Sequence, residues 1–234
     1  MTSLGGALFL VSSFGPGVAA FVTVWALEGR AGLACWVSQC LRWRLGWHWY
    51  ALAVISAPLL MLAAIGLQVA TGGTVPAATV QGSAMFFAAQ FVVVTLLGGP
   101  LGEEFGWRGY ALPALTERIG WRWAALCLGI VWGIWHLPLF WMPGTAQADL
   151  PMGLFLASTI ALSIVLARLS VNTGFSVLPA ILLHGAVNWS AMVLPVMPDG
   201  EDPRIYSIVM ALLFVTAGIV ILKPGPDWTA ASRR

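Results

Sequence analysis

Three short clusters of ionisable and amide side chains interrupt a sequence that is otherwise mostly apolar. Their members are Glu103, Glu104 and Arg108, then Trp132 and His136, and finally His184 and Asn188. Each cluster contains a pair of residues four positions apart, and such a pair shares one face of a helix. Glu103 would point about 100° away from Glu104. Glu104 can therefore pair with Arg108 while Glu103 faces another part of the protein.

These residue types can activate water. A carboxylate beside an imidazole in a dry pocket can deprotonate a water molecule, with one group as general base and the other orienting it. Asparagine and histidine side chains can donate hydrogen bonds to a developing oxyanion. Together Glu103, His136, His184 and Asn188 would supply both halves of peptide-bond hydrolysis. A serine or cysteine nucleophile with a neighbouring base is not evident in the sequence.

The same residues also suggest a metal site. Glu103, His136 and His184 form a reasonable set of zinc ligands. However, the His-Glu-x-x-His pair of zinc proteases is absent, because each histidine lies in a different apolar stretch. We favour a mechanism without a cofactor and keep zinc as the alternative. For any single cluster, a structural role in helix packing is the competing interpretation.

The elements that must position these residues are membrane helices. Of the 234 residues, 59% are hydrophobic and 9% are charged, whereas about a quarter of the residues of a soluble domain are charged. An ionisable group at bilayer depth costs at least a few kcal/mol and is therefore a functional candidate. The net charge of +2 and the lack of a basic run argue against a nucleic-acid partner.

Long apolar runs predict an all-α fold, a polytopic transmembrane helical bundle of about seven spans. The runs are 5–27, 47–70, 83–117, 121–141, 151–168, 174–194 and 205–222. The third run is too long for one span, and Gly98-Gly99-Pro100 predicts a break in it. Its second half, from about 101 to 117, would form a hairpin with 121–141. Glu103 and His136 would then lie roughly 21 Å up the two arms, and His184 roughly 18 Å up a third helix.

The charge distribution predicts a multi-pass protein of the cell membrane. With seven spans, most cationic residues fall on one side, while Arg204 lies among acidic residues on the other. Since loops rich in lysine and arginine are cytoplasmic, the N-terminus would be outside and the C-terminus inside. Residues 31–44 would form an interfacial helix on the cytoplasmic surface. Its apolar face would consist of Leu33, Trp36, Val37, Cys40 and Leu41. We expect one domain over residues 1–234.

The three clusters, in this order, resemble the signature of the CPBP family of intramembrane proteases (CAAX proteases and bacteriocin-processing enzymes, also called the Abi family). The family signature reads Glu-Glu-x-x-x-Arg, then Phe-x-x-x-His, then His-x-x-x-Asn or His-x-x-x-Asp. This chain has Glu103-Glu104-x-x-x-Arg108, Trp132-x-x-x-His136 and His184-x-x-x-Asn188, within a core of about residues 100–190. Tryptophan stands where phenylalanine is usual, which should preserve an aromatic wall.

The resemblance implies an endopeptidase whose pocket opens towards the cytoplasm. It implies that Glu103 and His136 activate the attacking water, that His184 and Asn188 hold the oxyanion, and that Arg108 fixes Glu104. Its substrate would be a membrane-bound peptide or protein, and the eukaryotic branch of the family acts beside a prenylated cysteine. The family has long carried a metalloprotease label, so the resemblance also leaves zinc open.

Two other classes of function fit the same residues. A non-catalytic protein that confers self-immunity to a bacteriocin, or that scaffolds a membrane partner, would need the polar clusters only for packing. A transporter or proton relay would use the same intramembrane glutamate and histidine. The sequence has no inverted repeat of the kind that transporters show, so we rank this reading last.

Overall fold

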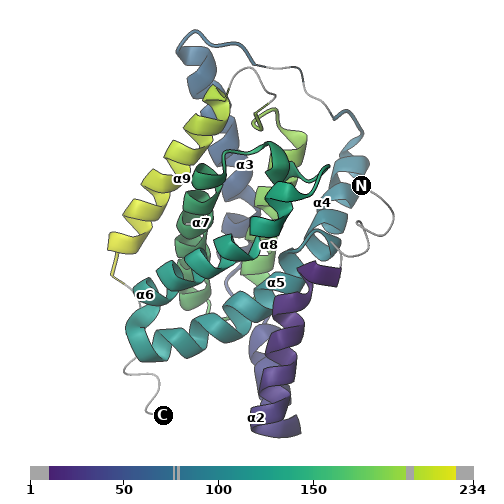
Figure 1. Ribbon diagram of the computed structural model, residues 1–234, viewed down its shortest axis with the longest axis vertical. Coiled ribbons are helices and arrows are strands. Elements are labelled where there is room, and N and C mark those ends of the chain that lie inside the picture. The colour runs from purple at the N-terminus through teal and green to yellow at the C-terminus, as the bar shows by residue number, and fades with distance from the viewer. Residues whose placement is uncertain (1–10, 76, 78–79, 199–202, 225–234) are drawn as a thin grey trace.

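The computed structural model describes residues 11–75, 77, 80–198 and 203–224, and within these residues the regular elements are all helices. The long helices α3, α7, α8 and α9 pack against one another, while α2 projects from the lower end of the bundle (Figure 1). This arrangement confirms the predicted all-α fold. The elements are α2 (Gly15–Cys40), α3 (Trp47–Ala70), α4 (Ala84–Leu97), α5 (Pro100–Gly106), η1 (Trp107–Ala111), α6 (Leu112–Trp135), η2 (Leu137–Trp141), η3 (Ala146–Asp149), α7 (Met152–Asn172), α8 (Leu178–Val193) and α9 (Arg204–Leu222).

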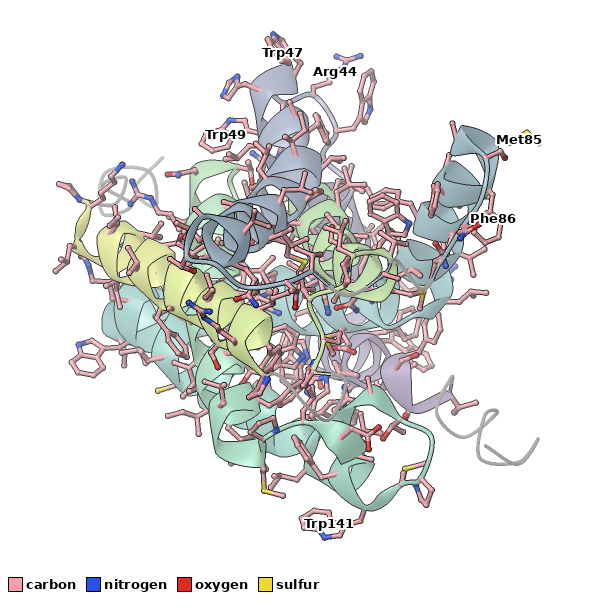
Figure 2. All side chains as sticks on the ribbon, turned by 90° about the horizontal axis from the view of Figure 1, so that it is seen from above. Arg44, Trp47, Trp49, Met85, Phe86 and Trp141 are labelled. Carbon is pink, nitrogen blue, oxygen red and sulfur yellow. The ribbon has the colours of Figure 1, made fainter. Side chains whose placement is uncertain are left out.

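The outer surface of the bundle is apolar, as a lipid environment requires. Large side chains project from its rim, and Trp47, Met85 and Trp141 are 79%, 82% and 69% exposed (Figure 2). Exposed apolar surface on this scale fits a protein that lies in a bilayer. The stretches that are long and apolar enough to cross a membrane are Gly15–Cys40, Trp47–Ala70, Ala84–Trp141, Met152–Asn172 and Arg204–Leu222. The chain is therefore a multi-pass membrane protein.

Several predicted spans agree closely with the observed helices. Helix α3 coincides with 47–70, and α9 differs from 205–222 by one residue. The span predicted over 121–141 ends earlier, because the α-helix stops at Trp135 and a 3-10 turn follows over Leu137–Trp141. Pro138 explains this difference, since its nitrogen cannot donate the hydrogen bond that would continue the α-helix.

The helix predicted over the long apolar run 83–117 is interrupted at the glycines where a break was predicted. Helix α4 ends at Leu97, and Gly99 adopts a φ of 107° before α5 begins at Pro100. The chain then continues through the π-helical turn η1 into α6, which reverses at Gly120, where φ is 77° and ψ is 154°. Figure 1 shows this reversal at the lower left of the bundle. The predicted hairpin is confirmed.

The first predicted span, 5–27, and the predicted helix over 31–44 both fall within α2 where they are described, while residues 5–10 of the span lie outside the described residues. Gly29 has a non-helical conformation, with φ 67° and ψ −161°. Phe105 lies against both Gly17 and Trp36, which would be roughly 28 Å apart on a straight helix. Helix α2 must therefore fold back at Gly29 into two arms. The bend at Gly29 separates the first predicted span from the predicted interfacial helix.

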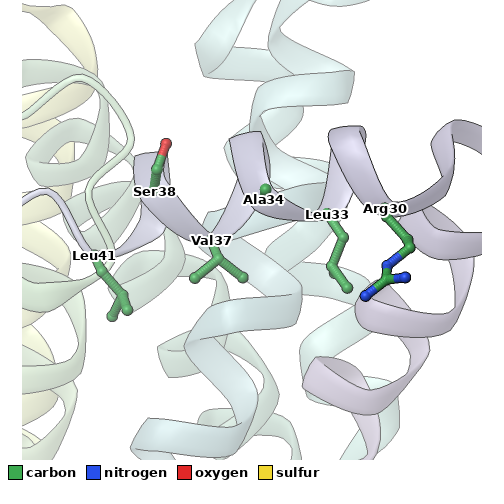
Figure 3. Close-up of a pocket in the computed structure, with 6 residues that line it drawn as sticks. All are labelled: Arg30, Leu33, Ala34, Val37, Ser38 and Leu41. Atoms are coloured by element: carbon green, nitrogen blue, oxygen red, sulfur yellow. The ribbon is translucent and has the colours of Figure 1, made fainter.

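The predicted interfacial helix is the second arm of α2. One part of its apolar face packs on the bundle, and the other part stays open. Trp36 donates a hydrogen bond from Nε1 to the main-chain oxygen of Gly109 at 3.1 Å, and Cys40 is buried beside it. The other part of this face lines an open groove of about 470 Å³ (Figure 3). Its lining residues are Arg30, Leu33, Ala34, Val37, Ser38 and Leu41. The face is divided because the arm packs on the bundle with one edge only.

Glycines set the closest helix contacts around the carboxylates. Gly102 and Gly106 are four positions apart on α5, and a Cβ at either would overlap the main chain of residues 13–16, where α2 begins. Small residues at this spacing let two backbones approach closely in membranes. A similar pair, Gly129 and Gly133, brings α6 against α7. The position of α5 therefore depends on the lack of a side chain at Gly102 and Gly106.

Substituting Gly106 by alanine should weaken the protein through this contact. The added Cβ would meet the backbone of Pro16, and such overpacking costs about 1–3 kcal/mol. Gly66 provides a matched control, since a Cβ there meets nothing within 4 Å. We expect the free energy of unfolding in mixed micelles to fall for Gly106→Ala, and to stay equal to that of the parent or rise by up to about 1 kcal/mol for Gly66→Ala, which lies inside α3. Equal values for the two variants would contradict the tight α2–α5 contact.

Basic residues from distant parts of the chain meet at one end of the bundle. Arg122 donates to the main-chain oxygens of Ile221 and Lys223, at 2.7 and 2.9 Å, and Arg42 donates to that of Gly174 at 2.9 Å. These contacts join the loop near 42 to that near 174, and the turn near 122 to the end of α9, so each pair lies on the same side as the seven-span reading requires. That this end faces the cytoplasm stays a prediction.

Candidate active site

Glu104 is the anchor of the buried cluster. It is fully buried, and its Oε1 accepts hydrogen bonds from Arg108 Nη1 at 2.8 Å and from His184 Nδ1 at 2.9 Å. Arg108 is one turn along the same helical segment, as its spacing predicted, whereas His184 comes from α8. Because Glu104 accepts from two donors, it ties α8 to the α5–η1 segment.

Glu103 faces the opposite arm of the hairpin. Its Oε2 accepts a hydrogen bond from the indole Nε1 of Trp132 at 2.6 Å, and the residue is 6% exposed. Its Oε1 makes no hydrogen bond to the part of the chain that the structure describes. Gly99 leaves space beside that atom, since a Cβ there would lie 2.6 Å from Oε1. The prediction that the two glutamates face different partners is confirmed.

Trp132 lies at the centre of the cluster. Its ring centroid lies 5.6 Å from that of His136 and 5.1 Å from that of His184, both in edge-on arrangements. The guanidinium carbon of Arg108 lies 4.6 Å from the same ring, within the range of a cation–π contact. The α5–η1 segment, α6 and α8 thus meet around one buried indole. The expectation that three separate helices bring polar groups to one level is confirmed.

His136 is half-buried at the end of α6. Its Nδ1 lies 2.7 Å from the main-chain oxygen of Trp132, and its ring packs against Phe155 of α7 at 5.4 Å. A carbonyl oxygen can only accept, so Nδ1 must carry the proton. In the neutral ring, Nε2 therefore has an available lone pair. This nitrogen can accept a proton or orient a water molecule.

Asn188 is the least constrained member of the predicted set. It is half-buried one turn after His184, and its Nδ2 donates to the main-chain oxygen of Gly98 at 3.4 Å. This long contact joins α8 to the break between α4 and α5. Gly185 also brings α8 close to α4, because a Cβ there would overlap the side chain of Thr95. Asn188 therefore lies beside the turn that leads to Glu103.

The residues as arranged do not fit the zinc alternative. Within the described ranges, no three histidine, cysteine, aspartate or glutamate side chains are placed to hold a metal ion. Glu103 Oε2 is occupied by the indole of Trp132, and His184 Nδ1 by Glu104. These contacts leave only Oε1 of Glu103 and the Nε2 atoms of His136 and His184 for any metal ligand role.

Sequence reasoning missed two contributors to the site. One is the indole N–H of Trp132, which was expected only to form an aromatic wall. The other is the second arm of α2, whose Trp36 reaches Gly109 in the π-helical turn beside Arg108. π-helical turns occur frequently at functional sites. The only signal in the sequence was a tryptophan at the place where the resemblance has phenylalanine.

The fold and the cluster define a class of protein: a polytopic helical membrane protein with two carboxylates, two histidines and an arginine enclosed among its helices. Residues 85–190 match the family described as Type II CAAX prenyl endopeptidase Rce1-like. The chain is also 30% identical over 173 residues to CAAX prenyl protease 2 of Methanococcus maripaludis, covering 70% of this chain and 62% of that protein. It therefore spans less than two thirds of this relative. Both matches confirm the resemblance to the CPBP family of intramembrane proteases.

Proposed function

We propose that this chain is an intramembrane endopeptidase that hydrolyses a peptide bond of a membrane-associated substrate. The observation that carries the proposal is the state of Glu103. This carboxylate is enclosed among membrane helices, one oxygen is held by Trp132, and the other makes no hydrogen bond to the described residues. A membrane protein bears the cost of burying such a group where the group has a function.

In the proposed reaction, Glu103 and His136 activate the attacking water. The water gives a proton to Oε1 of Glu103, while Nε2 of His136 orients it through its lone pair. The oxygen then bonds to the scissile carbonyl carbon, and the carbonyl electrons move to its oxygen. When the tetrahedral intermediate collapses, the C–N bond breaks and the proton held by Glu103 passes to the leaving amine.

His184 and Asn188 are the proposed donors to the oxyanion. Since His184 uses Nδ1 to bind Glu104, it can donate through Nε2 only when both ring nitrogens carry protons. The resulting imidazolium and Arg108 would balance the two carboxylates, so the formal charges of the cluster would sum to zero. A neutral cluster avoids the large cost of a net charge in a buried site. Asn188 would move its amide from the long contact with Gly98 to the oxyanion.

The proposed substrate is a peptide or protein with a prenylated C-terminal motif. This assignment follows from the names of the matching family and relative, which describe CAAX prenyl proteases. It agrees with an apolar outer surface from which a lipidated chain can approach within the bilayer. The test is cleavage of a farnesylated fluorogenic CAAX peptide by the purified protein in proteoliposomes. Product formation equal to that of a Glu103→Ala sample would overturn the proposal.

We expect this cleavage to withstand removal of metal ions. A mechanism through Glu103, His136 and ordinary water predicts that a strong chelator, followed by dialysis, changes kcat by less than twofold. Glu103→Ala, measured in parallel, sets the background rate. A loss of more than tenfold that added Zn²⁺ restores would instead favour the zinc set Glu103, His136 and His184.

A further inference from the structure

We propose that Trp132 is a positioning residue that fixes Glu103 for water activation. This inference rests on the proposed function. It assigns the indole a role that the phenylalanine of the family resemblance cannot perform, because phenylalanine has no N–H group. The assignment stands on a buried hydrogen bond between the two arms of the hairpin, from Trp132 Nε1 to Glu103 Oε2 at 2.6 Å.

The hydrogen bond gives the two oxygens of Glu103 different environments. An indole nitrogen only donates, so Oε2 is the acceptor and remains occupied. The carboxylate can then rotate little, and Oε1 stays in the space beside Gly99. Hydrogen bonds to ionised groups are roughly twice as strong as neutral ones. Trp132 thus selects which oxygen is available to water.

Trp132 is itself firmly held, as a positioning residue must be. Its side chain is 3% exposed and packs among apolar residues of α3, α7 and α8, including Ala53, Leu166 and Leu183. Arg108 lies over its ring at 4.6 Å. Its neighbour Gly133 keeps α6 close to α7. The indole therefore has little freedom to leave Glu103.

The same residue also orients the second member of the water-activating pair. The main-chain oxygen of Trp132 lies 2.7 Å from Nδ1 of His136 and fixes the position of the proton on that ring. Trp132 therefore directs Glu103 through its side chain and His136 through its backbone. Substitution by phenylalanine would remove the first contact and keep the second, since the main-chain carbonyl is retained along with an aromatic ring.

The test compares Trp132→Phe with Trp121→Phe. Trp121 lies on the same helix and is equally buried, but its Nε1 has no hydrogen-bond partner within the described chain. We expect Trp132→Phe to lower kcat about 10- to 100-fold, with KM within twofold of the parent. Trp121→Phe should leave both constants within twofold. A Trp132→Phe variant with the kcat of the parent overturns the positioning role, while activity of the parent still supports the proposed function.

A second measurement does not depend on turnover or on the folding of the tryptophan variant. The indole proton of Trp132, assigned by ¹⁵N–¹H NMR in detergent micelles, should resonate downfield because it is bonded to a carboxylate. Glu103→Gln should move this resonance and leave that of Trp121 unchanged. If the Trp132 signal does not respond to Glu103→Gln, the proposed contact is absent and the inference falls. A responsive signal supports it.

Discussion

Replacing Glu103 by glutamine is expected to lower kcat about 10²- to 10⁴-fold, the usual contribution of general base catalysis. Glutamine has nearly the same shape, and its amide oxygen can still accept from the indole of Trp132. The variant should therefore fold and insert like the parent. It cannot take a proton from water, so the loss should fall on kcat with KM little changed. Cleavage of the farnesylated peptide in proteoliposomes measures both constants.

Glu117→Gln is the matched control for this experiment. Glu117 is exposed near the turn at Gly120 and lies outside the buried cluster, so its loss should leave kcat within twofold. A Glu103→Gln protein that cleaves at the rate of the parent would contradict the enzyme assignment. That result would instead favour a packing role, as in a bacteriocin-immunity or scaffold protein.

The largest effect on stability is expected when Arg108 is replaced by glutamine. Arg108 is 1% exposed and Glu104 is fully buried, and their side chains lie 2.8 Å apart. Removing one partner of a buried pair leaves an uncompensated charge, which costs about 3–5 kcal/mol. Equilibrium unfolding in mixed micelles should show this loss. Arg44→Gln, an exposed position beside Trp43, should change the same quantity by less than about 1 kcal/mol.

The double variant Glu104→Gln with Arg108→Gln distinguishes the effect of losing the charge pairing from the effect of changing the side-chain volume. Because both charges are removed, neither remains buried without a partner. We therefore expect the free energy of unfolding of the double variant to be higher than that of Arg108→Gln alone. Strictly additive losses from the two single variants would contradict a direct pairing of Glu104 with Arg108.

The parts of the site that follow from spacing along one helix were predictable from the sequence. Four-residue separation places Glu104 beside Arg108, and the glycines before Pro100 give the break that starts α5. Matching distances from the turn near Gly120 bring the two arms of the hairpin together at the level of Trp132. Each of these features depends only on helix geometry and on the special conformations of glycine and proline.

The features that the sequence did not predict depend on contacts between distant residues. A break between residues 27 and 31 was predicted, but the direction in which α2 folds back at Gly29 depends on the surface that Gly102 and Gly106 offer to it. From the sequence alone, a glycine in an apolar run can indicate either a bend in the helix or a close contact with a neighbouring helix. Likewise, the partner of the Trp132 N–H is chosen by how α6 meets α5, which local periodicity does not specify.

The folded α2 has a mechanical consequence. Its first arm packs on Gly102 and Gly106, and its second arm contacts Gly109 through Trp36. The two arms therefore contact both ends of the helical segment that carries Glu103, Glu104 and Arg108. A displacement of α2 near Gly29 would therefore be transmitted to these three charged residues through its contacts at Gly102, Gly106 and Gly109.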